Sequence, residues 1–238
     1  MDKKNAEKGD KHERLFSNSL KNHSEVLQKL TDYFGIKGAF VRAYPTGAAG
    51  GKADVILSFS DPKHLRANVK SFGKVGVNQA ARGSVQSFVQ KCGLEELSKI
   101  LDEGVVRKST KGRFILESDQ DFVSQNLSPL AKTVVAYALA RLEEPELLVL
   151  YDNVKGVMHL YDLRRMLDQM TYEVSFSKPG NIMIGEYILF HRKGGDGNSK
   201  KFEKISPKHP GNNLAVKLLC KKVIAGIEPI VSYKTSGK

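Results

Sequence analysis

Two short apolar runs joined by a turn occupy residues 53–72, which read ADVILSFSDPKHLRANVKSF. In the first run Val55, Leu57 and Phe59 recur at every second position, the period of a β-strand with one buried face. An Asp-Pro pair at 61–62 marks a turn, and residues 65–72 follow as the second strand. The stretch therefore predicts a β-hairpin.

Polar side chains gather at one end of this hairpin. Asp54 opens the first strand, and Asn68 and Lys70, two residues apart, share a face of the second. Phosphodiester hydrolysis needs stabilisation of developing charge and a water activated near neutral pH, and Mg²⁺ bound by one or two carboxylates supplies both. Taken singly, such an Asp is more often a turn residue and such a Lys a solvated side chain. Together they are a candidate site for metal-dependent hydrolysis.

Helical and strand-like segments surround the hairpin. Apolar spacing predicts a helix over 13–34 that stops at Gly35, a strand over 39–44, and a helix over 79–91. Further on, the pattern predicts a helix after Pro129, a strand over 147–151 and a helix over 161–170, and then strands at 182–184, 187–192 and 214–223. This mixture predicts an α/β or α+β fold with a central mixed β-sheet flanked by helices. With no long linker or repeat, we expect one domain over 1–238.

The charge is large and unevenly distributed. The chain of 238 residues carries a net charge of +12. Residues 191–238 hold eleven Lys and Arg against three Asp and Glu, a net +8, whereas residues 94–172 hold ten against thirteen, a net −3. A basic region backed by a neutral or acidic body is typical of a nucleic-acid-binding surface, because phosphate neutralisation releases counterions.

Several segments together resemble a known family. Lys8 to Glu13 before the first helix, Lys52 to Val55, Asn68-Val69-Lys70, and Gly76 to Gln79 are similar to the MspI-like type II restriction endonucleases of the PD-(D/E)xK superfamily, which cut GCGC or CCGG. Residues 185–197, ending RKGGDG, are similar to the C-terminal recognition region of the GCGC cutter of that group. The matched regions occur in the expected order at the two ends of the chain, and the middle matches only in its helical character.

The resemblance implies a restriction-endonuclease-like fold and a Mg²⁺-dependent, site-specific cut in double-stranded DNA, made by a homodimer at a short CG-containing palindrome. It implies a catalytic hairpin at about 53–72, with metal ligands Asp54, the Val69 carbonyl and Glu13, and with Lys70 orienting or deprotonating the attacking water. Asn68 stands where the superfamily usually has Asp or Glu. An amide is normal there in the MspI-like group, although an Asp→Asn or Glu→Asn knock-out would give the same sequence.

DNA recognition is expected in a segment at about 185–217. Donors and acceptors that read base edges in the major groove are concentrated there, and Gln79 and Arg82, on the helix after the hairpin, are expected near the scissile phosphates. The candidate base-reading residues within the segment are Arg192, Lys193, Asp196, Asn198, Lys200 and Lys201.

Two other functions remain open from the sequence. One is a PD-(D/E)xK nuclease of repair or mobile-element type without strict site specificity, and the other is a non-catalytic basic DNA-binding protein. With two cysteines, no signal pattern and no membrane-length apolar run, we expect a cytoplasmic protein that does not enter membranes.

Overall fold

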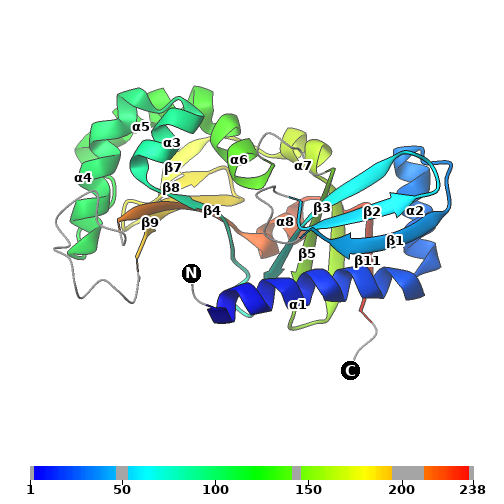
Figure 1. The fold of residues 1–238 in the computed structure, drawn as a ribbon. Helices are drawn as coiled ribbons and strands as arrows, with labels where there is room; N and C mark the ends of the chain where they lie inside the picture. Colours follow the sequence, from blue (N-terminus) through cyan, green and yellow to red (C-terminus); the bar gives the residue numbers. More distant parts are fainter. Residues whose placement is uncertain (1–2, 47–52, 141–145, 195–211, 236–238) are drawn as a thin grey trace. The chain divides into compact units, whose positions relative to one another are not determined.

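The computed structural model describes residues 3–46, 53–140, 146–194 and 212–235, and within 3–10 only the backbone. The chain divides into two compact units: residues 1–78, 140–169 and 220–238 form unit 1, and residues 79–139 and 170–219 form unit 2. Each unit has its own β-sheet (Figure 1).

Unit 1 is built on a six-stranded mixed sheet of order β1-β2-β3-β5-β6-β11. β3 and β5 are parallel, and the other neighbours are antiparallel. The strands are β1 Phe40–Pro45, β2 Val55–Phe59, β3 His64–Phe72, β5 Leu147–Asp152, β6 Val157–Asp162 and β11 Val231–Lys234. The helices are α1 Lys3–Ser19, the 3-10 turn η1 Leu20–Asn22, α2 Ser24–Phe34, α7 Leu163–Gln169 and α8 Cys220–Gly226.

One face of this sheet packs against the N-terminal helices. Phe16 of α1 and Leu30 of α2 are fully buried in one hydrophobic cluster with Val55, Ala67 and Val69 of β2 and β3. Because strand side chains alternate between faces, Asn68 and Lys70 project from the opposite face of β3. These two side chains therefore lie on the face away from α1, whereas the Asp54 carboxylate and the Val69 carbonyl lie at the end of the sheet where β3 extends beyond β2.

Unit 2 combines a five-stranded sheet of order β4-β10-β9-β8-β7 with a layer of helices. Its strands are β4 Asn78–Gly83, β7 Val174–Phe176, β8 Ile182–Ile184, β9 Ile188–Lys193 and β10 Asn213–Leu218. Its helices are α3 Val85–Cys92, η2 Glu95–Leu97, α4 Ser98–Ser109, η3 Glu117–Asp119, α5 Gln120–Leu127, η4 Ser128–Leu130 and α6 Ala131–Leu139.

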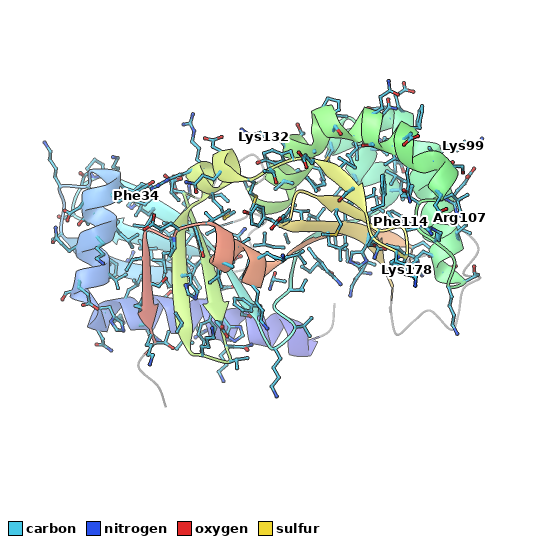
Figure 2. The ribbon with its side chains drawn as sticks, turned by 180° about the vertical axis from the view of Figure 1, so that it is seen from behind. Phe34, Lys99, Arg107, Phe114, Lys132 and Lys178 are labelled. Carbon is cyan, nitrogen blue, oxygen red and sulfur yellow. The ribbon has the colours of Figure 1, made fainter. Side chains whose placement is uncertain are left out.

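Close backbone approaches join α4 to the segment after it. Arg107 donates a hydrogen bond from Nη2 to the carbonyl of Phe114 at 3.2 Å, and the two residues lie together in Figure 2. A Cβ on Gly104 would lie 2.5 Å from that carbonyl oxygen, so only glycine fits this position of the helix without a shift of the backbone.

The predicted fold class is confirmed: the protein is an α+β fold with a mixed sheet flanked by helices. The hairpin is also confirmed, because β2 and β3 pair antiparallel with Val55 opposite Ala67 and Leu57 opposite Leu65.

Four predicted elements were wrong in type or extent. In the helix expected over 161–170, Tyr161 and Asp162 belong to β6, and α7 begins at Leu163. The helix expected over 13–34 is two helices separated by η1, where the His23 backbone leaves helical geometry (φ −129°, ψ 68°). Residues 78–83 form strand β4, and the helix begins only at Val85, because the Ser84 hydroxyl accepts a hydrogen bond from the Ser87 amide and caps the first turn. The strand expected over 214–223 ends at Leu218, and helix α8 follows.

No helix within the described ranges combines the length and the apolar character needed to span a bilayer.

Candidate active site

Asp54 stands at the start of β2, where β3 continues beyond its neighbour. The Asp54 amide donates to the Ala67 carbonyl at 2.8 Å, and its carbonyl accepts from the Thr46 amide at 3.1 Å. The next peptide of β3 that points toward β2 is that of Val69, two residues on. At this end of the sheet β2 has no backbone carbonyl opposite the Val69 amide, and the side chain of Asp54 accepts that hydrogen bond instead.

The Asp54 carboxylate links the backbone and the side chain of the opposite strand. Its Oδ2 accepts a hydrogen bond from the Val69 amide at 2.7 Å and from Lys70 Nζ at 3.3 Å. Lys70 Nζ also donates to the Val69 carbonyl at 3.4 Å. The side chains of Asp54 and Lys70 are 24% and 16% exposed. The ion pair is thus sheltered by protein and still open to solvent on one side.

Two oxygens at this position suit a hard cation. The carboxylate of Asp54 and the carbonyl of Val69 both lie within hydrogen-bonding distance of the same ammonium group, so they converge on one positive charge. Carboxylate and carbonyl oxygens are ligands that Mg²⁺ accepts, usually with several waters retained. The residues therefore fit a magnesium ion. The described residues contain no cluster of three or more His, Cys, Asp and Glu side chains.

Asn68 lies between these groups on β3 and is fully buried. An ionised carboxylate at such a position would carry a large desolvation cost, whereas an amide carries a smaller one. Burial gives a physical reason for an amide at this position.

Glu13 belongs to α1, on the other face of the sheet. It precedes the buried Phe16 by three residues and so lies on the same side of the helix. The neighbouring His12 packs its ring 5.4 Å from the ring of Tyr151 in β5, which places this part of α1 near the end of the sheet where β3 and β5 finish. A role for Glu13 as a second carboxylate stays a prediction.

The expected DNA-contacting residues that the structure describes lie in unit 2. Gln79 and Arg82 are exposed, but they lie on strand β4 and not on a helix as predicted. Arg192 and Lys193 lie on β9 and, as consecutive strand residues, point to opposite faces. Arg192 donates from Nε to Asn212 Oδ1 at 2.8 Å. Asp196, Asn198, Lys200 and Lys201 lie outside the described residues.

His191 shares a sheet face with Lys193. Burial, followed by the charge of Lys217 on β10, lowers the pKa of His191 to about 4, so its imidazole is neutral near pH 7. The period of two along β9 places residues 191 and 193 on this face together.

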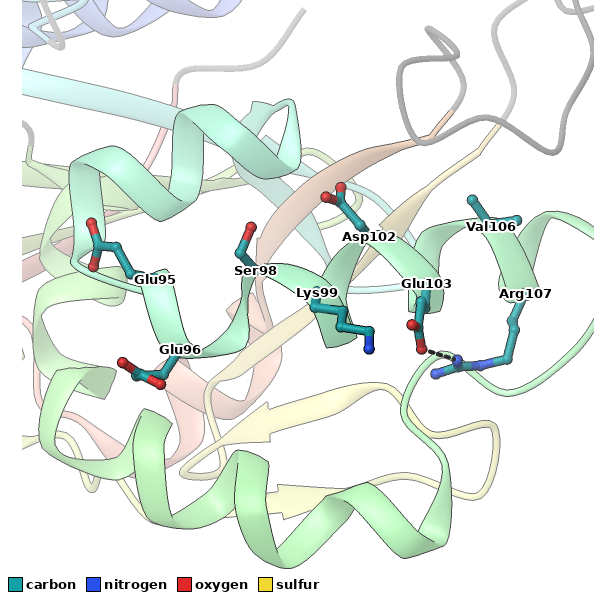
Figure 3. A pocket seen from close by; sticks show the side chains of 8 residues that line it. All are labelled: Glu95, Glu96, Ser98, Lys99, Asp102, Glu103, Val106 and Arg107. Atoms are coloured by element: carbon teal, nitrogen blue, oxygen red, sulfur yellow. Dashed lines mark hydrogen bonds and ion pairs between the residues drawn. The ribbon is translucent and has the colours of Figure 1, made fainter.

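A hollow of about 770 Å³ lies on the surface of unit 2, beside η2 and α4 (Figure 3). Four of its eight lining residues are acidic and two are basic, and Arg107 is paired with Glu103 at 3.4 Å. Burial raises the pKa of Asp102 in this hollow. This excess of acidic over basic side chains disfavours a phosphate ligand. The lining residues are Glu95, Glu96, Ser98, Lys99, Asp102, Glu103, Val106 and Arg107.

No family model matches the chain, and no curated protein matches it. Among solved structures, the chain is similar to the restriction endonuclease MspI in complex with its cognate DNA, with a TM-score of 0.53 and 11% sequence identity over 86% of this chain and 81% of that one. At this identity the similarity concerns the fold alone. The chain has a restriction-endonuclease-like fold.

Proposed function

We propose that this protein is a Mg²⁺-dependent endodeoxyribonuclease that cuts double-stranded DNA at a specific short palindrome, as a type II restriction enzyme does. The observation that carries the proposal is the meeting of the Asp54 carboxylate, the Val69 carbonyl and the Lys70 ammonium at the end of β3, in a fold similar to that of a DNA-cutting enzyme. The net charge of +12 further supports a polyanionic substrate.

Each group has a defined task in this proposal. Mg²⁺ would neutralise charge on the scissile phosphate and lower the pKa of a water molecule. Asp54 and the Val69 carbonyl would hold it, with Glu13 as a candidate further ligand. Lys70 would donate hydrogen bonds to the attacking water or to a phosphate oxygen, and so fix the line of attack. Asn68 would anchor this part of β3 by its burial, and so help to hold Lys70, two residues further along the same strand.

Base-specific reading is assigned to the segment at about 185–217. Arg192 and Lys193 on β9 belong to this segment, and Gln79 and Arg82 on β4 are candidate contacts to the phosphates. Removal of a base-reading side chain would relax specificity at one position at a cost of about 1–3 kcal/mol, whereas removal of a phosphate contact would weaken binding to all sequences alike.

Digestion of a plasmid tests the proposal. The protein is incubated with supercoiled plasmid in Mg²⁺ and in EDTA, beside the Asp54→Ala variant. We expect discrete fragments with common ends in Mg²⁺ only. A smear would instead indicate a nuclease without site specificity. Retarded DNA with no cutting would indicate a non-catalytic DNA-binding protein and would contradict the proposal.

A further inference from the structure

β3 and β5 finish next to each other just beyond the candidate active site. Phe72, two residues after Lys70, is in register with Asp152, and the Asn153 amide donates to the Phe72 carbonyl at 3.1 Å. Both strands then enter tight turns. These turns lie within unit 1, at the end of the sheet where Asp54 contacts Val69.

The turn after β3 is held in a fixed shape by Lys221 of α8. The Gly76 amide donates to the Gly73 carbonyl at 2.9 Å and closes the turn. Lys221 Nζ donates to the Lys74 carbonyl at 2.6 Å. The stem of Lys221 fills the space beside Gly76 (φ +74°), where a Cβ would lie 2.5 Å from it. The tip that this framework presents consists of Lys74, which is exposed, and Val75, which is 85% exposed.

The turn after β5 is also held in a fixed shape, in this case by the buried side chain of Asp152. Asp152 is 5% exposed, and its Oδ1 accepts hydrogen bonds from the amides of Val154 at 3.0 Å and Lys155 at 3.1 Å. The Gly156 amide closes the turn on the Asp152 carbonyl at 2.8 Å. The tip again pairs an exposed valine with an exposed lysine, since Val154 is 58% exposed and Lys155 follows it.

The two tips have the same composition and no role in the core. Isolated exposed valines are ordinary on protein surfaces. Here, however, two adjacent turns each present an exposed valine beside a lysine. The backbone of each turn is held by the hydrogen bonds described above. The single acidic side chain within the two turns, Asp152, is buried and occupied by its own turn. A surface of fixed cations and apolar tips matches the phosphates and the apolar sugar and base edges of a DNA groove.

Distance along the chain supports contact with the same DNA. Gly73 follows Lys70 by three residues, which is about 10 Å of strand. A DNA strand carries one phosphate per about 3.4 Å of helix axis. A strand whose phosphate reaches Lys70 therefore has neighbouring phosphates within reach of these turns.

We propose that the turns at residues 73–76 and 152–156 form a DNA-gripping rim beside the active site, in which Lys74 and Lys155 bind phosphates flanking the cut and Val75 and Val154 contact apolar atoms of the groove. The inference rests on the proposed function and goes beyond it, because neither turn belongs to the catalytic hairpin or to the recognition segment. Lys221 is a positioning residue that holds the first turn.

The charge contribution is tested with the double variant Lys74→Gln/Lys155→Gln. Binding to a linear plasmid fragment is measured without divalent metal at several salt concentrations. We expect binding between about tenfold and a hundredfold weaker near 0.1 M salt, and a salt dependence flatter by about two units of slope. The matched control is Lys29→Gln/Lys37→Gln: both lysines are exposed, and Lys37 precedes β1, which starts opposite Phe59 at the far end of the sheet.

The apolar contribution is tested with Val75→Ser/Val154→Ser against Val41→Ser, which is 59% exposed on β1. We expect the double valine variant to bind about three- to tenfold more weakly with the salt slope unchanged, because a contact without charge releases no counterions.

A second control belongs to the charge test. The variant Lys74→Arg/Lys155→Arg keeps both charges and should show the salt slope of the wild-type protein, which separates lost charge from misfolding.

The outcomes distinguish the two proposals. If the wild-type protein neither binds nor cuts DNA, the proposed function is wrong and the rim with it. If the wild-type protein binds and cuts while both double variants match their controls, the rim alone is wrong. If the valine variants change the sedimenting mass of the free protein and leave DNA binding intact, the tips contact a second copy and the DNA assignment is wrong.

Discussion

Asp54 has a structural contact as well as a proposed chemical one, and the two can be separated. Its carboxylate caps the Val69 amide at 2.7 Å and pairs with Lys70 at 3.3 Å. Asp54→Ala and Lys70→Ala should each slow cleavage at least about a hundredfold, while DNA binding persists because affinity comes mainly from phosphate contacts. Single-turnover cleavage and gel retardation measure the two properties.

The matched variant is Asp54→Asn, which keeps an oxygen that can accept from Val69 and removes the charge that would hold a cation. We expect its stability to stay near that of the wild-type protein and its cleavage to fall as far as in Asp54→Ala. Near-normal cleavage by Asp54→Asn or Lys70→Ala in Mg²⁺ would show that the reaction takes place elsewhere.

Asn68 poses a question that one comparison answers. If the amide is native, the protein as written cuts DNA, and Asn68→Asp or Asn68→Glu brings no gain; since Asn68 is fully buried, the added charge should also lower the unfolding midpoint. If the amide is a knock-out, only the carboxylate variants cut. Cleavage by all three proteins in parallel, with thermal unfolding of each, decides between the two.

At the scale of elements, α3 offers a direct test of where a helix begins. The Ser84 hydroxyl accepts from the Ser87 amide at 3.1 Å and satisfies one of the free donors of the first turn. Ser84→Ala should therefore lower the free energy of unfolding by about 1 kcal/mol, and Ser84→Asp should preserve it. Denaturant unfolding of the three proteins provides the measurement. Equal stability of Ser84→Ala and wild type would place the start of the helix elsewhere.

The sheet of unit 2 carries a pH-dependent element. His191 on β9 has a pKa lowered to about 4 by burial and by the charge of Lys217, with smaller effects of Lys193 and Lys108. An unfolded His191 takes up a proton near pH 6.5, and the folded one only near pH 4. Stability should therefore fall as the pH drops from about 6.5 toward 4.

Replacement of the histidine tests this. His191→Gln cannot be protonated, so the loss of unfolding midpoint between pH 7.5 and pH 5 should be smaller in the variant than in the wild-type protein. An equal loss in both proteins would assign the pH dependence to other groups, such as His159, whose pKa is also lowered by burial.

The elements also show what the sequence can reveal. The β2–β3 hairpin was predictable because strict alternation and an Asp-Pro turn are local signals. The break between α1 and α2 was not, because apolar residues continue through Leu20 at helical spacing and the change lies in the backbone of His23. In the segment of β4, Ala80 and the apolar residues of α3 follow one another in a pattern that also fits a single longer helix. Residues 78–83 form a strand because they pair with β10, and the sequence does not show that pairing.

For the candidate site, the sequence could bring Asp54, Asn68 and Lys70 to one end of a hairpin by spacing alone. It could not show that the Asp54 carboxylate caps the Val69 amide, because that contact depends on where β2 begins relative to β3. Nor could it show that the turns beyond β3 and β5 are adjacent, since they are about eighty residues apart in the chain and only the parallel pairing of the two strands brings the strand ends together.

At the scale of the whole molecule, the proposed function predicts cooperation between two copies of the chain. One site holds one scissile phosphate, whereas a double-strand cut at a palindrome requires two phosphates related by a two-fold axis. We therefore expect two chains of 26.4 kDa on each cognate duplex. Analytical ultracentrifugation of the complex in the absence of divalent metal measures this mass.

A mixing experiment tests whether both copies must be active. Lys70→Ala, which should bind DNA without cutting it, is added in excess to the wild-type protein and supercoiled plasmid. If two copies act together, most assemblies contain one active site, so nicked circles should accumulate at the expense of linear DNA. If a single copy cuts both strands, the complex should have the mass of one chain per duplex, and linear DNA should form more slowly but remain the main product. Agreement between the mass and the product distribution is required, because an inactive competitor alone slows cutting in either case.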